Sequence, residues 1–137
     1  MNYQTTGPRL TALVGRGLLA SDEQQARDLA RIIRARRRRG KYFPAHLFSD
    51  PAWDILLSVA LADLEQQRIS MGELCDAADA PRTTALRYLQ VMIDEGVVVR
   101  VDDPLDRRRK FISLSPNAAV QMAHYLGSQP FAELKAA

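Results

Sequence analysis

The sequence predicts a mainly α-helical protein with one small β-hairpin, which is an α+β fold class. Apolar residues recur at helical spacing along most of the 137 residues. A β-branched run occurs only once, near residue 100, and side chains typical of helix caps precede the helical segments. We expect a flexible arm at 1–20, a folded domain at 21–126 and a C-terminal tail at 127–137.

The first predicted helix spans 22–38. Ser21 can cap its first turn, where acidic side chains also complement the helix dipole. Gly40 is expected to end it. After a connector at 41–49, Asp50 is expected to cap a central helix that is buried on much of its surface. The apolar side chains of this central helix are Trp53, Ile55, Leu56, Leu57, Val59, Ala60 and Leu64.

Two further helices follow in close succession. Ser70 and Glu73 form a capping-box pattern before a short helix at 71–78, whose Leu74 and Ala78 are expected to point inward. A longer helix at 81–95 begins with proline and ends at a glycine. A short helix, a tight turn and a longer helix are typical of a helix-turn-helix, in which the second helix enters the major groove of DNA.

The outward face of the 81–95 helix carries residues suited to DNA. Leu86, Leu89 and Ile93 are expected to face the core. Arginine can bind guanine bidentately, whereas threonine and tyrosine can bind phosphate. The alternative interpretation is an ordinary solvated helix face. The candidate DNA-binding residues of this helix are Arg82, Thr83, Thr84, Arg87 and Tyr88, with Val91 also expected to face outward.

A hairpin is predicted directly after this helix. Strands at 97–101 and 107–114 flank a polar turn at 102–106, and a last helix is expected at 116–126. The hairpin, 102–114, would form the wing of a winged helix-turn-helix and contact the DNA backbone or the adjacent minor groove. Alternatively, its charges only prevent edge-to-edge association. The candidate DNA-binding cations of the wing are Arg107, Arg108, Arg109 and Lys110.

The stretch 74–126 resembles the DNA-binding core of MarR-type winged-helix regulators. Three segments carry the resemblance: the helix-to-strand junction 93–98, the wing motif Asp-Pro-Leu-Asp-Arg-Arg-Arg-Lys at 103–110, and the 112–116 segment before the last helix. The resemblance implies a DNA-binding regulator that acts as a homodimer. It also implies that Asp106 orients Arg108, which would enter the minor groove.

A second basic cluster lies near the end of the first helix. Seven basic residues and no acidic residue occur between Arg31 and Lys41. The cluster has three interpretations: a solvated helix end, an additional backbone contact, or a clamp on a neighbouring DNA segment. The candidate backbone contacts are Arg36, Arg37, Arg38 and Arg39. The net charge of +3 and the isoelectric point of about 9.3 agree with an acidic partner.

The sequence does not indicate an enzyme. We expect no catalytic residues, no cofactor and no metal, because His46 and His124 are far apart and no phosphate-binding glycine motif is present. Cys75 is the only cysteine, so a reducing compartment is expected, and packing is a better interpretation of it than redox sensing. No membrane segment is predicted. A small-molecule effector is possible, although no residue pattern indicates one.

The leading hypothesis is therefore a cytoplasmic, nucleoid-associated regulator that binds double-stranded DNA sequence-specifically as a homodimer. One alternative is a winged-helix module for protein–protein interaction, supported by Tyr88, Val91 and the apolar residues between positions 10 and 19. Another alternative is a non-specific architectural DNA-binding protein that relies on the arginine cluster.

Overall fold

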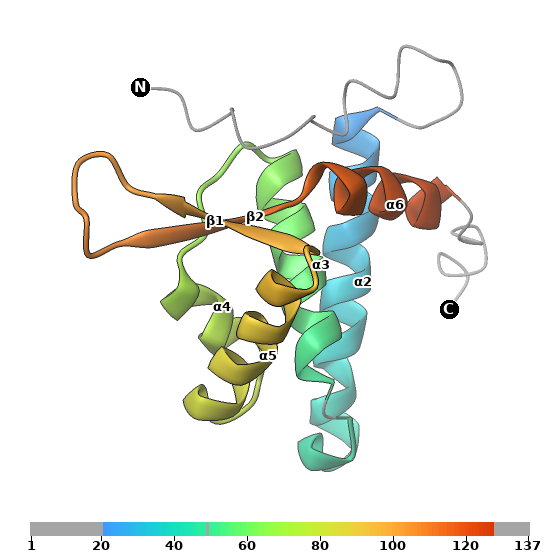
Figure 1. Cartoon of the computed structure of the whole chain (residues 1–137). Helices are drawn as coiled ribbons and strands as arrows, with labels where there is room; N and C mark the ends of the chain where they lie inside the picture. The colour runs from blue at the N-terminus through green and yellow to red at the C-terminus, as the bar shows by residue number, and fades with distance from the viewer. Residues whose placement is uncertain (1–20, 49, 128–137) are drawn as a thin grey trace.

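The computed structural model describes residues 21–48 and 50–127, and it packs helices beside one antiparallel hairpin (Figure 1). The predicted fold class, mainly helical with a small β-hairpin, is confirmed. In chain order the elements are α2 (Asp22–Tyr42), the 3-10 helix η1 (Ala45–Phe48), α3 (Pro51–Leu64), α4 (Met71–Ala77), α5 (Arg82–Asp94), β1 (Val98–Asp102), β2 (Lys110–Leu114) and α6 (Pro116–Gly127).

Helix α2 begins where predicted but continues beyond Gly40, so the prediction that Gly40 ends it was wrong. Ser21 Oγ accepts a hydrogen bond from Gln24 N at 3.2 Å and caps the first turn. At the other end Phe43 has an extended backbone, with φ −134° and ψ 156°. Pro44 explains this end, because a proline disfavours the helical conformation in the residue before it. The predicted connector then contains η1.

Helix α3 is the centre of the fold. Asp50 Oδ1 accepts a hydrogen bond from Trp53 N at 3.4 Å, which confirms the predicted cap. Helix α3 lies between α2 on one side and the α4–α5 pair on the other (Figure 1), and it also packs against β2. Trp53 and Leu56 are only half-buried. The buried residues of α3 are Pro51, Ile55, Leu57, Val59, Ala60, Ala62 and Leu64.

Helices α4 and α5 form the predicted pair. The capping box at Ser70 and Glu73 is present, with Glu73 N donating to Ser70 Oγ at 3.1 Å. Leu74 and Ala78 are buried, as predicted. After α5, Gly96 has a φ of 75°, a left-handed conformation that lets the chain leave the helix and enter β1.

The hairpin is shorter than predicted at its second strand. The pairing runs from Val98 opposite Leu114 to Asp102 opposite Lys110. The segment 107–109 therefore belongs to the turn, and the prediction that β2 begins at residue 107 was wrong. The middle of β2 is joined to the segment before α4 by Ile112 N, which donates to the Ile69 carbonyl at 3.0 Å.

Asp63 of α3 also holds the hairpin. Its Oδ2 accepts a hydrogen bond from Leu114 N at 2.9 Å, and Ser113 Oγ donates to its Oδ1 at 2.9 Å. Burial raises the pKa of Asp63 above its usual 3.8, although these two hydrogen bonds oppose the rise. The carboxylate thus fixes β2 to the central helix across a long separation in sequence.

Helix α6 completes the described part of the chain. Ser115 Oγ accepts a hydrogen bond from Ala118 N at 3.2 Å and caps the helix. The rings of Trp53 and Tyr125 meet edge to face, with centroids 5.2 Å apart and planes at 83°, and so join α3 to α6. The predicted arm at 1–20 and tail at 127–137 lie outside the described residues, except for Gly127 at the end of α6.

Candidate nucleic-acid interface

Helix α5 presents a polar, positively charged face to solvent. Three small or apolar side chains, Ala85, Leu89 and Met92, are buried against the fold and set the orientation of the helix. Arg82, Thr83, Arg87 and Tyr88 are exposed, as predicted, and Val91 is exposed beside them. No carboxylate occurs in α5 before its last residue, Asp94.

One outward prediction for α5 needs correction. Thr84, predicted to face outward, is half-buried, because it lies next to the buried Ala85 at the edge of the contact with the fold. Leu86 and Ile93 are half-buried and pack against the core, as predicted. The exposed Gln90, which was not among the predicted site residues, shares the solvent side and donates to Asp94 at 2.9 Å.

The turn of the hairpin is held by its own aspartates. Asp103 is buried, and its Oδ1 accepts a hydrogen bond from Leu105 N at 2.8 Å. Asp106 Oδ1 accepts from Arg108 N at 3.0 Å and from Arg108 Nε at 3.4 Å. The Arg108 side chain is nevertheless 92% exposed. Asp106 therefore holds the Arg108 backbone and Nε, while the rest of the guanidinium is accessible to an anion.

The four cations at 107–110 are in different environments. Arg107, Arg108 and Arg109 are exposed, and the Arg109 guanidinium also lies 5.2 Å from the ring centroid of the buried Phe111. Lys110 Nζ lies 2.6 Å from Asp102 Oδ1, and this contact lowers the pKa of Asp102 below its usual 3.8. Phe111 was missed by the sequence analysis, although an aromatic residue directly after a basic run is a signal for such stacking.

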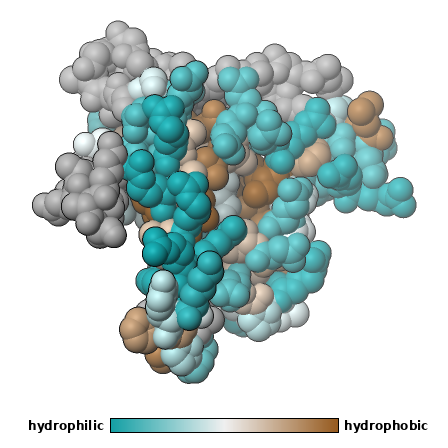
Figure 2. All heavy atoms as spheres, turned by 180° about the vertical axis from the view of Figure 1, so that it is seen from behind, coloured by the Kyte–Doolittle hydropathy of each residue, from teal (hydrophilic) through white to brown (hydrophobic). Residues whose placement is uncertain are grey.

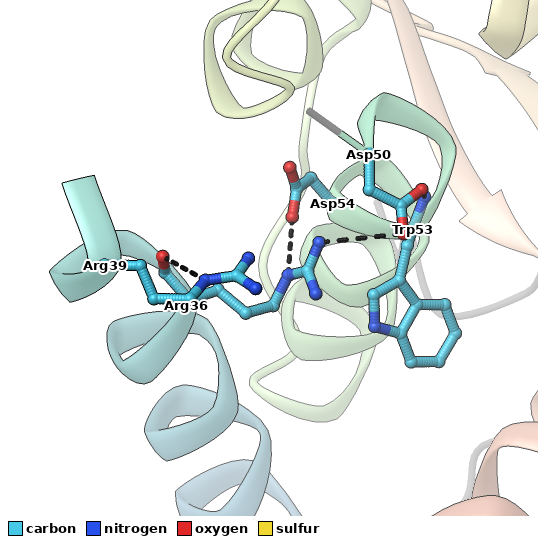
Figure 3. A network of polar contacts seen from close by, with 5 residues as sticks. All are labelled: Arg36, Arg39, Asp50, Trp53 and Asp54. Carbon is cyan, nitrogen blue, oxygen red and sulfur yellow. Dashed lines mark hydrogen bonds and ion pairs between the residues drawn. The ribbon is translucent and has the colours of Figure 1, made fainter. Parts of the chain in front are cut away.

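The cluster at Arg36–Arg39 is divided between the interior and the surface. Arg36 Nε lies 2.8 Å from Asp54 Oδ1, and its Nη2 lies 3.8 Å from Asp50 Oδ2 (Figure 3). Arg39 is half-buried and donates to the Arg36 carbonyl at 3.2 Å. Arg37 and Arg38 are exposed. Arg36 thus joins α2 to α3, and two of the four candidate cations remain on the surface.

A cleft separates the end of α2 from the turn between α4 and α5. Its volume is about 270 Å³. Arg37 and Gly40 line one wall, and Asp76 and Asp79 line the other. The exposed Arg37 therefore lies across this cleft from the turn that precedes α5.

The described residues contain neither a metal centre nor a transmembrane helix. Within 21–48 and 50–127, no group of three or more histidine, cysteine, aspartate or glutamate side chains could hold a metal ion. None of the helices in these ranges is both long enough and apolar enough to cross a bilayer. Cys75 is buried in the core, in agreement with its interpretation as a packing residue.

Residues 48–109, which contain α3, α4, α5 and most of the hairpin, match the model of the MarR family. The resemblance to the MarR family is therefore confirmed. No curated protein matches the chain in sequence. The MarR-type segment includes every exposed residue of α5 described above and the turn cations up to Arg109.

Solved structures share the same winged-helix fold. A mutant of S. aureus MepR is 19% identical, with a TM-score of 0.51, and the match covers 63% of this chain and 60% of that one. The transcriptional regulator PA4135 is 18% identical, with a TM-score of 0.51 and 76% of each chain covered. A mutant of MarR from E. coli, complexed with operator DNA, is 19% identical over 82% of this chain and 71% of that one, with a TM-score of 0.47. The match to MepR spans about 60% of the length of the MepR chain.

Proposed function

We propose that the chain is a transcriptional regulator that binds double-stranded DNA sequence-specifically, with α5 in the major groove and the hairpin on the backbone or in the minor groove. The observation that carries the proposal is the pairing of two surfaces: the exposed face of α5, which has no carboxylate before Asp94, and the exposed Arg108 held by Asp106 at the adjacent turn. Both surfaces present cations that phosphate and base edges can bind.

Each residue has a distinct role in this proposal. Arg87 reads base edges from the middle of α5, while Arg82, Thr83 and Tyr88 contact phosphates or flanking bases. Arg107 and Arg108 contact the backbone or minor groove from the hairpin turn. Arg109 and Lys110 are held by Phe111 and Asp102, so they contribute positive potential more than direct contacts. The half-buried Thr84 can reach only the edge of such an interface.

The helix-end cluster is a subsidiary part of the proposal. Of the four candidate backbone contacts, Arg37 and Arg38 are exposed, and Arg37 lies across the cleft from the turn before α5. Arg36 is committed to Asp54, and Arg39 is half-buried beside it. We therefore assign the backbone contact to Arg37, since Arg38 does not line this cleft. Phosphate contacts of this kind add affinity and salt sensitivity without sequence preference.

The proposed regulator acts in the cytoplasm, in association with the nucleoid, without catalytic activity, and it binds DNA as a homodimer. Two copies would place their α5 helices in successive major grooves, about 34–36 Å apart. The described residues carry nothing that selects a small-molecule effector, so none is proposed.

The decisive experiment is selection of bound duplexes from a random-sequence pool at near-physiological salt. We expect enrichment of a palindrome whose half-sites lie about one helical turn apart. On that site, Arg87→Ala should relax base preference at one position, costing about 1–3 kcal/mol for the preferred base pair. Arg108→Ala should weaken binding. Enrichment of no sequence despite binding would indicate a non-specific architectural protein instead.

A protein-interaction module is the second candidate function. It is favoured by the exposure of Tyr88, at 40%, and Val91, at 45%, which lie together on the solvent face of α5. Such a module would show no affinity for any duplex in the selection. Its partner binding would also change little with salt, since an apolar contact is not screened.

A further inference from the structure

A straight row of cations runs along the outer side of α2. Arg27, Arg31, Arg34, Arg38 and Lys41 follow one another at intervals of three or four residues, so they lie on one side of the helix. At 1.5 Å per residue, this cationic row is about 21 Å long. Seen from behind, hydrophilic side chains form a continuous column along the helix (Figure 2).

The side of α2 opposite this row is the side that the fold buries. Gln25 and Leu29 are buried, and Ile33 and Arg36 are half-buried where α2 packs against α3. Helices α4 and α5 lie beyond α3, on its other side (Figure 1). The cationic row therefore faces away from α5, and a duplex bound by α5 and the hairpin leaves the row open to solvent.

The charges of the row are poorly compensated within the fold. Arg36, on the inner side of the same helix, has two carboxylates, Asp54 and Asp50, within 4 Å. In the row, Arg31 lies 3.5 Å from Asp28. Its other four members form no ion pair with any residue of 21–48 or 50–127. Like charges at this spacing repel one another, so a bound polyanion would relieve the repulsion.

We propose that the cationic row binds the phosphate backbone of a second DNA duplex, so that one molecule holds two DNA segments. Four of its five members are arginines, whose planar guanidinium groups bind phosphate bidentately. The proposal rests on the proposed function for the first duplex. Once that duplex is bound, neighbouring DNA is present at a high effective concentration.

A nucleic acid fits the row better than a folded protein does. Protein interfaces have an apolar core, whereas the large apolar residues of α2 between Gln25 and Arg36, namely Leu29, Ile32 and Ile33, already pack against the core of this chain. A second copy docked symmetrically on the row would bring two sets of cations together, which charge repulsion disfavours.

The proposal can be tested by co-capture of two duplexes. A biotinylated duplex carrying the selected site is immobilised, the protein is added, and retention of a labelled duplex of unrelated sequence is measured. The wild-type protein should retain the second duplex. Arg34→Gln combined with Arg38→Gln should reduce this retention at least tenfold while changing affinity for the immobilised site less than twofold. Arg34→Lys combined with Arg38→Lys is the matched control and should retain it.

Salt dependence gives a second readout. If the four row cations without a carboxylate partner contact phosphates, the logarithmic salt slope for the second duplex should be about 3.6, and the glutamine variant should lower it to about 1.8. Unchanged retention in the glutamine variant would overturn the proposal. An equal loss of affinity for the immobilised site would also overturn it, because the row would then belong to the first interface.

A further variant separates this proposal from the proposed function. Arg87→Ala with Arg108→Ala disables the α5 and hairpin surfaces, and binding to an arbitrary duplex is then measured at low salt. Residual binding that disappears on adding Arg34→Gln and Arg38→Gln supports DNA binding by the cationic row, even if no sequence was enriched in the selection. Absence of any residual binding rejects it.

Discussion

Arg108 shows how a single exposed side chain can be positioned by its own backbone. Asp106 accepts hydrogen bonds from both the amide and the side chain of Arg108. Because the side chain is 92% exposed, the ion pair itself contributes little to stability, about 0–1 kcal/mol. Its effect lies in limiting the directions that the guanidinium can take before it meets a ligand.

We expect Asp106→Ala to weaken duplex binding several-fold while leaving the free energy of unfolding within about 1 kcal/mol of wild type. Asp106→Asn keeps an acceptor for the Arg108 amide and should lose less affinity. Fluorescence anisotropy on the selected duplex, together with urea unfolding, measures both quantities. Equal affinity for the wild type and the alanine variant would show that the turn does not need this carboxylate.

Asp63 is expected to give the protein an unusual pH dependence. Because burial raises its pKa above 3.8, the folded state binds this proton more tightly than the unfolded state. Its contribution to the free energy of unfolding therefore decreases as the pH rises through the raised pKa. Asp63→Asn keeps an acceptor oxygen toward Leu114 N and removes the titration.

Urea unfolding of both proteins, in the pH interval starting at 3.8, measures this contribution. The free energy of unfolding of the wild type, minus that of Asp63→Asn, should decrease as the pH rises. Asp102 has the opposite sign, since its lowered pKa stabilises the fold above 3.8 and this is lost on acidification. It is present in both proteins and cancels in the difference. A difference independent of pH would contradict the prediction.

At the scale of elements, α2 and α3 are joined by a polar contact beside their apolar one. Arg36 is 19% exposed and Asp54 is 20% exposed, so neither charge is fully solvated. Removing one member leaves the other partly buried without its partner. This cost is below the 3–5 kcal/mol of a fully buried pair, because solvent screens both groups.

We expect Arg36→Ala to lower the free energy of unfolding by about 1–2 kcal/mol. The neighbouring Arg38→Ala, on the exposed side of the same helix, should change it by less than about 0.5 kcal/mol. A double-mutant cycle with Asp54→Ala isolates the pairwise coupling in urea unfolding. A coupling near zero would mean that Arg36 acts only through its aliphatic part.

The junction between α5 and β1 depends on a glycine. Gly96 has a φ of 75°, and a Cβ added there would meet nothing within 4 Å. Gly96→Ala should therefore cost about 1–2 kcal/mol from backbone strain alone. Gly72→Ala in α4 is the control, since its Cβ would lie 3.9 Å from Ser70 Oγ and its φ is not positive. In thermal unfolding, the melting temperature of the Gly72 variant should equal or slightly exceed that of the wild type.

Local chemistry explains which parts of the fold could be predicted from the sequence. The caps at Ser21, Asp50 and Ser70 act within three residues, so their patterns located the starts of α2, α3 and α4. The end of α2 was mispredicted because Pro44, not Gly40, decides it. The contact of Asp63 with β2 and the inward turn of Arg36 depend on tertiary packing, which no local pattern encodes.

The same limit applies to the candidate site. The exposure of Arg82, Arg87 and Tyr88 followed from helical periodicity. The different environments of the wing cations could not be predicted in this way, because Phe111 and Asp102 contact Arg109 and Lys110 only once the strands pair. The direction of the cationic row also required knowing which side of α2 packs against α3.

On the scale of the whole molecule, the arrangement of charge matters more than its sum. The net charge is only +3, yet exposed cations gather on α5, on the hairpin turn and on the outer side of α2. Carboxylates such as Asp63 and Asp54 are used inside the fold. Folding and ligand binding should therefore respond differently to salt.

We expect affinity for the selected duplex to fall about a hundredfold between 50 and 200 mM salt if about four phosphates are contacted. The free energy of unfolding should change by less than about 1 kcal/mol over the same range, because exposed ion pairs contribute little. Titrations and urea unfolding in matched buffers test both statements. Salt-insensitive binding would favour the protein-interaction module.

The edge-to-face contact between α3 and α6 has a spectroscopic consequence. Trp53 is the only tryptophan among the 137 residues, and its ring rests against Tyr125 of α6. The tryptophan fluorescence of the native protein therefore comes from a single indole at this junction. Detachment of α6 would expose the indole to water and shift its emission to the red, whereas motion of the hairpin turn would leave the spectrum unchanged. The emission maximum of the unlabelled protein therefore reports whether α6 is packed against α3.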